Sequence, residues 1–253
     1  AAILAGFHAR AERHTGAAGS GSGRVESVLR INEAGLSAAR ELFGDAPVQE
    51  LVDATRSLWQ RHRALLDTRQ REGRVRLTHG DLHLRNIVEI DGEPTLFDCL
   101  EFDTEMATTD ILYDLAFLLM DLWHRDLRAL ANLLFNRYLD AVDETGGLPL
   151  LPLFLSMRAT VRAHVLATQA VESSGEDREV VARESRAYLD LARVLLKPQA
   201  AGLIAIGGFS GTGKSTAAAA VAAEIGVPPG ARILSSDRIR KRLHGVDPEM
   251  RLP

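Results

Sequence analysis

One stretch of the chain, residues 79–103 with the sequence HGDLHLRNIVEIDGEPTLFDCLEFD, carries the side chains that phosphoryl transfer to a hydroxyl group requires. That reaction needs a carboxylate to accept the hydroxyl proton and oxygen ligands to hold Mg²⁺ on the nucleotide phosphates. Asp81 and Asn86 share one short loop, where they can supply the base and one metal ligand, and Asp98 follows after a hairpin. We therefore predict that Asp81 is the catalytic base and that Asn86 and Asp98 bind Mg²⁺.

A second stretch, residues 207–216 with the sequence GGFSGTGKST, matches the phosphate-binding pattern G-x-x-x-x-G-K-[ST]. Glycines let the backbone wrap around a phosphate and turn successive N–H groups inward. Lys214 would contact the β- and γ-phosphates, and the hydroxyl of Ser215 would bind Mg²⁺. The pattern predicts a P-loop that binds ATP through Gly208, Ser210, Gly211, Thr212, Gly213, Lys214, Ser215 and Thr216.

The segment SDRIRKRL, residues 236–243, has two interpretations. In the first, Asp237 contacts the substrate that accepts the phosphate, while Arg238 or Arg242 binds phosphate. In the second, Asp237 caps a helix and the basic residues form its solvated face. Both stay open for Asp237, and the solvated face is favoured for most of the basic residues.

The elements that must position these side chains follow from the spacing of apolar residues. Short β-type runs flank the catalytic stretch, and Asp91-Gly92 predicts a hairpin turn between two of them. Residues 15–24, TGAAGSGSGR, predict a flexible, turn-rich segment. Helical spacing predicts helices at residues 1–14, 48–68, 111–124, 127–142, 151–169 and 177–196.

Residues 197–202, KPQAAG, predict a linker between two domains. After it, LIAIG predicts a buried strand, residues 214–225 an Ala-rich helix and ARILSSD a second strand. Strand, Gly-rich loop, helix and strand are the opening of a parallel α/β domain, here predicted over residues 203–253. A domain needs roughly 100 residues, and the chain begins inside a predicted helix without Met. We therefore expect a fragment of a longer protein.

The composition is that of a soluble protein rather than a nucleic-acid or membrane protein. The 253 residues are 46% hydrophobic and 25% charged, with a formal net charge of −4. This balance disfavours non-specific attraction to nucleic acid, and no uninterrupted apolar run approaches the roughly 18 residues of a membrane span. The single cysteine, Cys99, fits a reducing compartment. We therefore expect a cytoplasmic protein without a membrane partner.

The motifs HGDLHLRN, LFDCLEFD and DILYDLAFLLMDL resemble, in their order and spacing, those of the aminoglycoside phosphotransferases, which are relatives of protein kinases. The resemblance covers residues 1–196 and implies an α-rich α/β fold, a kinase-like C-lobe with a small hairpin. It also implies ATP and Mg²⁺ as cofactors and a hydroxyl of a small molecule as acceptor. For Asp81, Asn86 and Asp98 it implies the roles already predicted, and it implies that Asp114 supports the catalytic loop.

The resemblance leaves several neighbouring groups with open roles. His79 is expected to buttress the loop, and His83 either faces the acceptor or packs. Glu101 and Asp103 either support the catalytic residues from behind, or face the acceptor, or belong to a solvated loop. For Asp81 itself, the alternative is a turn-forming residue.

The resemblance also predicts what is missing before residue 79. GSGSGRV, residues 19–25, superficially resembles a Gly-rich kinase loop, yet no strand precedes it and no Lys-bearing strand follows. We read it as a flexible loop, so the kinase-like half is expected to lack its ATP clamp.

The joining of the two halves resembles a bacterial family of fused aminoglycoside phosphotransferase-like and P-loop ATP-binding proteins. The favoured hypothesis is an ATP-dependent phosphotransferase with a second, P-loop kinase domain. One alternative is a non-catalytic regulator that binds nucleotide, and another is a P-loop half that acts as a nucleic-acid end kinase. The acidic balance disfavours the last.

Overall fold

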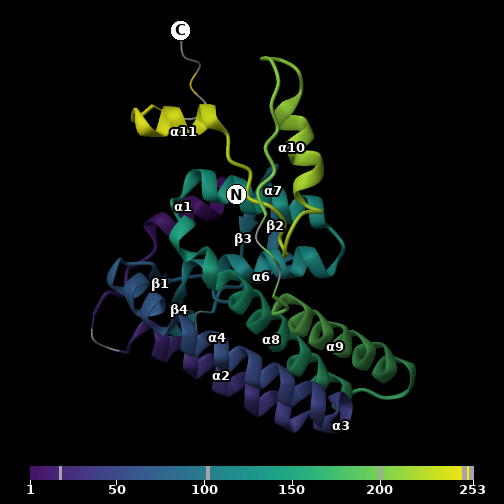
Figure 1. Ribbon diagram of the computed structural model, residues 1–253. Coiled ribbons are helices and arrows are strands. Elements are labelled where there is room, and N and C mark those ends of the chain that lie inside the picture. The colour runs from purple at the N-terminus through teal and green to yellow at the C-terminus, as the bar shows by residue number, and fades with distance from the viewer. Residues whose placement is uncertain (17–18, 101–102, 199, 201, 247–249, 251–253) are drawn as a thin grey trace.

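The computed structural model describes residues 1–16, 19–100, 103–198, 200, 202–246 and 250. It is largely helical, with two small sheets (Figure 1). The elements are α1 (Ala2–Arg10), α2 (Gly21–Ala38), α3 (Arg40–Phe43), α4 (Asp45–Arg71), β1 (Val75–Leu77), η1 (Leu84–Asn86), β2 (Ile87–Ile90), β3 (Glu93–Leu96), α5 (Thr104–Ala107), β4 (Thr108–Asp110), α6 (Ile111–His124), α7 (Arg128–Ala141), η2 (Thr145–Leu150), α8 (Leu151–Glu172), α9 (Gly175–Leu195), α10 (Lys214–Ala222) and α11 (Ser236–Leu243).

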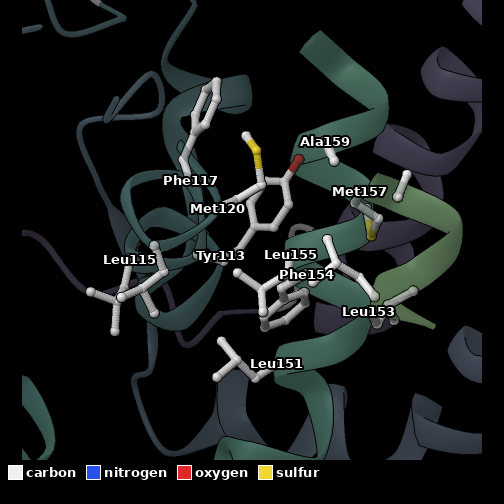
Figure 2. Close-up of a cluster of buried hydrophobic side chains, with 14 of the residues drawn as sticks. Tyr113, Leu115, Phe117, Met120, Leu151, Leu153, Phe154, Leu155, Met157 and Ala159 are labelled. Atoms are coloured by element: carbon white, nitrogen blue, oxygen red, sulfur yellow. The ribbon is translucent and has the colours of Figure 1, made fainter. Parts of the chain in front are cut away.

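Four long helices, α2, α4, α8 and α9, pack together at one end of the molecule (Figure 1). α6 packs on α8 and joins this bundle to α7. Twelve of the fourteen residues of α6 are buried, because its sequence is apolar on nearly every side. Figure 2 shows Tyr113 of α6 and Phe154 of α8 in one cluster, and their rings meet edge to face with centroids 5.4 Å apart. A polar residue on α6 therefore needs a partner inside the protein.

Two antiparallel ladders flank the predicted catalytic loop. β1 pairs with β4, and β2 pairs with β3. Asp91 and Gly92 join β2 to β3 with φ angles of 52° and 81°, the positive values that a two-residue hairpin turn requires. The predicted hairpin is confirmed, and residues 78–86 connect one ladder to the other.

One helical stretch, Thr145–Glu172, is long and apolar enough to cross a membrane by length and composition. Its most apolar window is 72% buried inside the protein, and α8 packs against α2, α6 and α9. The core helix of a soluble protein meets the same length criterion, and contacts with three helices are typical of a core helix.

The predicted helices between residues 48 and 196 are confirmed as α4, α6, α7, α8 and α9, with ends that differ by three residues or fewer. The flexible segment predicted at residues 15–24 and the loop predicted at residues 19–25 are wrong from Gly21 onward, where α2 begins. The Ser20 hydroxyl caps this helix and accepts the Gly23 N–H at 3.0 Å. A Cβ at Gly21 would lie 2.3 Å from the Leu66 carbonyl oxygen, so glycine here permits close packing of α2 on α4.

The two strands predicted after the linker are not formed within residues 202–246. The side chains of Leu203 and Ile204 are 91% and 61% exposed, and no ladder bonds are assigned to either segment in this described range. A parallel strand exists only through hydrogen bonds to a neighbouring strand, and the Ile233 amide instead donates to the Asn136 side chain at 2.7 Å. The predicted helix after the P-loop is present as α10.

A buried ion cluster locks α4 to the start of α6. The Arg69 guanidinium donates two hydrogen bonds to Asp110, at 2.6 and 2.8 Å, and one to Glu144 at 2.6 Å. Asp110 in turn caps α6 by accepting the Leu112 N–H at 2.8 Å. Arg74 forms a further ion pair with Glu144.

We predict that Arg69→Met lowers the free energy of unfolding by about 3–5 kcal/mol, because it leaves buried carboxylates without their main counter-charge. Urea unfolding followed by circular dichroism measures the change. Arg61→Met, at an exposed position of the same helix, is the matched control and should change stability little. Equal stability of the two variants would contradict the role of the cluster.

Candidate functional site

Asp81 and Asn86 contact each other on the loop between β1 and β2. The Asn86 side-chain amide donates to the Asp81 backbone carbonyl at 2.9 Å and to its carboxylate Oδ2 at 3.0 Å. Asn86 is 5% exposed, whereas the Asp81 side chain is 38% exposed. The amide is therefore held inside the loop, and the carboxylate reaches solvent.

Asp98 is held against this loop by its neighbours on both sides. The Phe97 N–H donates to the Asn86 carbonyl at 3.1 Å, and His79 Nε2–H donates to the Phe97 carbonyl at 2.9 Å. Two residues after Asp98, the Leu100 N–H donates to the His79 carbonyl at 3.0 Å. Asp98 itself is exposed and has a left-handed backbone with φ of 59°. The fold therefore brings the three predicted residues to one place, while their roles in chemistry stay predictions.

Gly80 allows this loop to close. Its φ is 79°, and a Cβ there would lie 2.7 Å from the Leu100 side chain. Its N–H donates to Oδ1 of Asp114 at 2.9 Å. A residue with a side chain would both strain the backbone and push away the segment that carries Asp98.

Asp114 is fully buried at the first turn of α6 and connects the loop to the N-terminal helix. Its second oxygen lies 3.1 Å from His8 Nε2, and His8 Nδ1 lies 2.7 Å from the Tyr138 hydroxyl. Arg158 lies 3.9 Å from Asp114 and over the face of the Tyr113 ring. Asp114 thus contacts the loop as predicted, through the backbone of Gly80.

The pKa of Asp114 is lowered. Burial alone would raise the pKa, but the His8 hydrogen bond, the Arg158 charge and the Gly80 N–H stabilise the ionised form more strongly. The pKa of Tyr138 is raised, chiefly by burial. The phenol therefore stays protonated and can donate to His8.

The pKa of Asp81 is lowered as well. Burial would raise it, while the hydrogen bond and charge of His83, the charge of Arg158 and the Asn86 amide lower it. The carboxylate is therefore ionised at neutral pH, the form that accepts a proton. His83 Nε2 lies 3.5 Å from Asp81, and its ring packs edge-on against Phe117.

The remaining open roles are partly resolved. His79 buttresses the loop through the Phe97 carbonyl, as expected. His83 packs against Phe117 and also faces Asp81; contact with an acceptor stays a prediction. Asp103 caps α5 by accepting the Met106 N–H at 2.9 Å; a role beside the catalytic residues or toward an acceptor stays a prediction. Glu101 lies outside the described residues.

Three residues that position the loop were missed in the sequence. Asp121, two turns after Asp114 on α6, accepts the Leu84 N–H at 3.0 Å and so holds η1. An acidic residue in the all-apolar helix was the available signal. His8 and Arg158 carried no local signal, because they reach the site only through the packing of α1 and α8.

A large cavity of about 1040 Å³ lies elsewhere, between the start of α2 and the segment from α5 to β4. Its polar lining mixes acidic residues such as Glu26 and Glu105 with the basic Arg24 and Arg30. Asp81, Asn86 and Asp98 do not line it. We therefore do not assign the cavity to the predicted catalytic residues.

The predicted P-loop has the backbone of a turn that opens a helix. Gly208, Gly211 and Gly213 have φ of 150°, 80° and 83°. Lys214 Nζ donates to the Phe209 carbonyl at 2.5 Å, across the loop. Within the described residues no side chain caps α10, so its first N–H groups suit an anion. The hydroxyl side chains of the loop that are exposed are Ser210, Thr212, Ser215 and Thr216.

Asp237 lies in the first turn of α11 and pairs with Arg240 at 2.8 Å and Lys241 at 2.9 Å. Asp237 is the second residue of α11 and does not cap it; the Ser235 hydroxyl instead accepts the Arg238 N–H at 3.4 Å. Contact with a substrate stays a prediction. The Arg242 side chain lies outside the described part of the chain.

The amino-acid sequence is similar to a known protein family and to two mycobacterial proteins. Residues 1–150 match the sequence model described as "Phosphotransferase enzyme family" (APH). Two relatives are the uncharacterized protein Rv2004c of Mycobacterium tuberculosis and the uncharacterized protein Mb2027c of Mycobacterium bovis. Each is 32% identical over 250 residues, which are 96% of this chain and 48% of the relative. The chain thus spans about half the length of these relatives, and no solved structure matches it.

We predict that Asp114→Asn destabilises the protein by about 3 kcal/mol at pH 7, because Arg158 loses its buried counter-charge. A lowered pKa means that Asp114 stabilises the fold above the ordinary carboxyl pKa and loses this contribution as pH falls through the lowered value. The stabilities of variant and wild type should therefore converge at acid pH.

Urea unfolding between pH 2 and pH 7 measures this convergence. Asp53→Asn, at an exposed position of α4, is the control and should track the wild type throughout. A gap for Asp114→Asn that stays constant with pH would contradict the lowered pKa.

Proposed function

The chain belongs to the phosphotransferase enzyme family, and from this premise we propose that it moves the γ-phosphate of ATP to a hydroxyl group of a small molecule. The observation that carries the proposal is the meeting of Asp81, Asn86 and the Asp98 segment at one loop. Family membership supports a phosphotransferase-type, kinase-like enzyme. The acceptor and the residue roles are our proposal.

In this proposal Asp81 accepts the hydroxyl proton of the acceptor as the new oxygen–phosphorus bond forms and the bond from the γ-phosphorus to the bridging oxygen breaks, releasing ADP. Its lowered pKa keeps it ionised before the step, and the Asn86 amide holds one of its oxygens in place. His83 Nε2 lies 3.5 Å from the Asp81 carboxylate and can orient it. Asp114 and Asp121 of α6 accept hydrogen bonds from the loop backbone. The Asp81 carboxylate therefore does not need to reorganise during the step.

The proposed Mg²⁺ ligands fit the chemistry of that ion. The Asn86 amide nitrogen faces Asp81, which leaves its side-chain oxygen free of that contact. Asp98 is exposed and directly follows Phe97, whose N–H bonds to the Asn86 backbone. Mg²⁺ prefers oxygen ligands and is commonly held by one or two carboxylates together with substrate phosphates and water. When bound, it would neutralise charge on the phosphates. The described residues hold no cluster of three or more His, Cys, Asp or Glu suited to a metal, and a site of this kind needs none.

We propose a second nucleotide site at the P-loop, in a kinase domain that begins at residue 203. The uncapped start of α10 and the position of Lys214 support it. Ser215 would contribute its hydroxyl to Mg²⁺ there, and Asp237 would face the acceptor. We further propose a cytoplasmic protein, in keeping with its single cysteine.

We predict that Asp81→Asn lowers Mg-ATP-dependent phosphate transfer by roughly 10²–10⁴-fold, the usual contribution of a positioned general base. The assay follows γ-phosphate transfer to water and to a panel of hydroxyl-bearing small molecules. Glu89→Gln, an exposed carboxylate on β2, is the control and should keep wild-type activity. Full activity in Asp81→Asn would exclude Asp81 as the base. A wild type that binds Mg-ATP but transfers no phosphate would favour the non-catalytic regulator.

We predict that Lys214→Ala removes Mg-ATP binding at the P-loop of the intact chain, measured by calorimetry, because Lys214 would contact the β- and γ-phosphates there. Lys197→Ala, at an exposed position after α9, is the charge-matched control. If binding persists in Lys214→Ala and disappears in Asp98→Asn, the kinase-like half binds the nucleotide instead. A test with single-stranded oligonucleotides distinguishes a small-molecule acceptor from a nucleic-acid end.

A further inference from the structure

One face of α7 is polar and buried, which its place in the kinase-like half does not explain. Asn132, Asn136 and Asp140 recur every four residues and therefore line one side of the helix. Asn132 and Asn136 are only 3% and 6% exposed. Buried amides persist where partners satisfy them, and here the partners lie in residues 229–233, beyond the P-loop. Figure 1 shows α10 beside α7.

The Asn136 carboxamide binds the backbone of this segment as a neighbouring strand would. Its Nδ2 donates to the Ala231 carbonyl at 3.1 Å, and its Oδ1 accepts the Ile233 N–H at 2.7 Å. Arg232 donates to the same Oδ1 at 3.1 Å. Asn132 adds bonds to the Pro229 and Ala231 carbonyls, each at 3.0 Å. The side chains of α7 thus replace the ladder that the predicted strand lacks.

Gly230 shows that the approach is close. A Cβ at this position would lie 2.5 Å from the Ala222 carbonyl oxygen and 2.8 Å from Asn132 Nδ2. Its φ of 94° is also one that side chains rarely adopt. The turn between α10 and the docked segment is therefore shaped to fit against α7.

Asp140 joins both ends of the segment that leads to α11. Arg232 Nη2 lies 2.7 Å from Oδ1 of Asp140, and Arg238 lies 3.4 Å from Oδ2. Asp237, the proposed acceptor-side residue, stands directly before Arg238. The carboxylate on α7 therefore pairs with an arginine side chain on each side of the stretch from Ile233 to Asp237.

We propose that α7 of the kinase-like half is the platform that positions the acceptor side of the P-loop site, with Asn136 and Asp140 as positioning residues. This inference rests on the proposed nucleotide site at the P-loop. The kinase-like half and the P-loop half then act as one unit, because the segment that carries Asp237 takes its hydrogen bonds from α7 rather than from its own sheet.

Amide hydrogen exchange of the intact chain tests the docking without any nucleotide. The Ile233 N–H bonds to Asn136, whereas the Ala231 N–H bonds to the Ala222 carbonyl at 2.7 Å and serves as an internal control. Asn136→Leu should make the Ile233 amide exchange at least tenfold faster and leave Ala231 little changed. Leu133→Gln, at an exposed position of α7, should change neither. An Ile233 amide that stays equally protected in Asn136→Leu would overturn the proposal.

Asp140→Asn is a second variant, at a less buried position. It tests the docking if fast exchange of the α6 amides shows that Asn136→Leu unfolds the protein. It should speed exchange at residues 232–238, and unchanged exchange there would overturn the platform. Mg-ATP is then added to both proteins. In the wild type, exchange should slow at the P-loop and at residues 232–238, and in Asp140→Asn at the P-loop alone. Equal slowing at 232–238 in both would also overturn the platform. If Mg-ATP slows nothing at the P-loop of the wild type, the nucleotide site is wrong, and the first arm still judges the docking.

Discussion

The predicted catalytic loop depends on one buried interaction, the hydrogen bond from the Gly80 N–H to the carboxylate of Asp114. A carboxylate at the start of an otherwise apolar helix is costly to bury unless hydrogen bonds and charge compensate it. His8 and Arg158 provide that compensation from α1 and α8. The loop backbone is therefore tied to three helices through a single side chain.

Further hydrogen bonds from side chains and backbone groups hold the rest of the loop. Asp121 holds the next turn of the loop from the same face of α6, and Asn86 then aligns Asp81 inside the loop. The backbone bonds around Asp98 close the arrangement from the hairpin side. The predicted catalytic residues are thus positioned by groups that lie in helices and in a hairpin, the kind of support that a preorganised site needs.

α7 belongs to both parts of the molecule. Tyr138 on this helix contacts His8. His8 contacts Asp114, which accepts the Gly80 N–H, so α7 is linked to the predicted catalytic loop. Asn136 and Asp140, which lie two positions before and two positions after Tyr138, contact the segment beyond the P-loop. One helix therefore contacts both the network behind the predicted catalytic loop and the segment that follows the predicted P-loop. This shared helix is the physical basis of the proposal that the two halves act as one unit.

The sequence by itself determined the local features: the helices α4, α6, α7, α8 and α9, the Asp91-Gly92 hairpin, and the family motif around Asp81, Asn86 and Asp98. These depend on apolar periodicity, turn chemistry and short spacings, which neighbouring residues set. Only the tertiary structure decided that Gly21 begins a helix, because its need for close packing against Leu66 involves a residue 45 positions away. Only the tertiary structure likewise decided that His8 contacts Asp114. It also decided that the Ile233 amide bonds to Asn136 rather than to a neighbouring strand. Contacts between distant residues leave no periodic signal, so packing alone selects these partners.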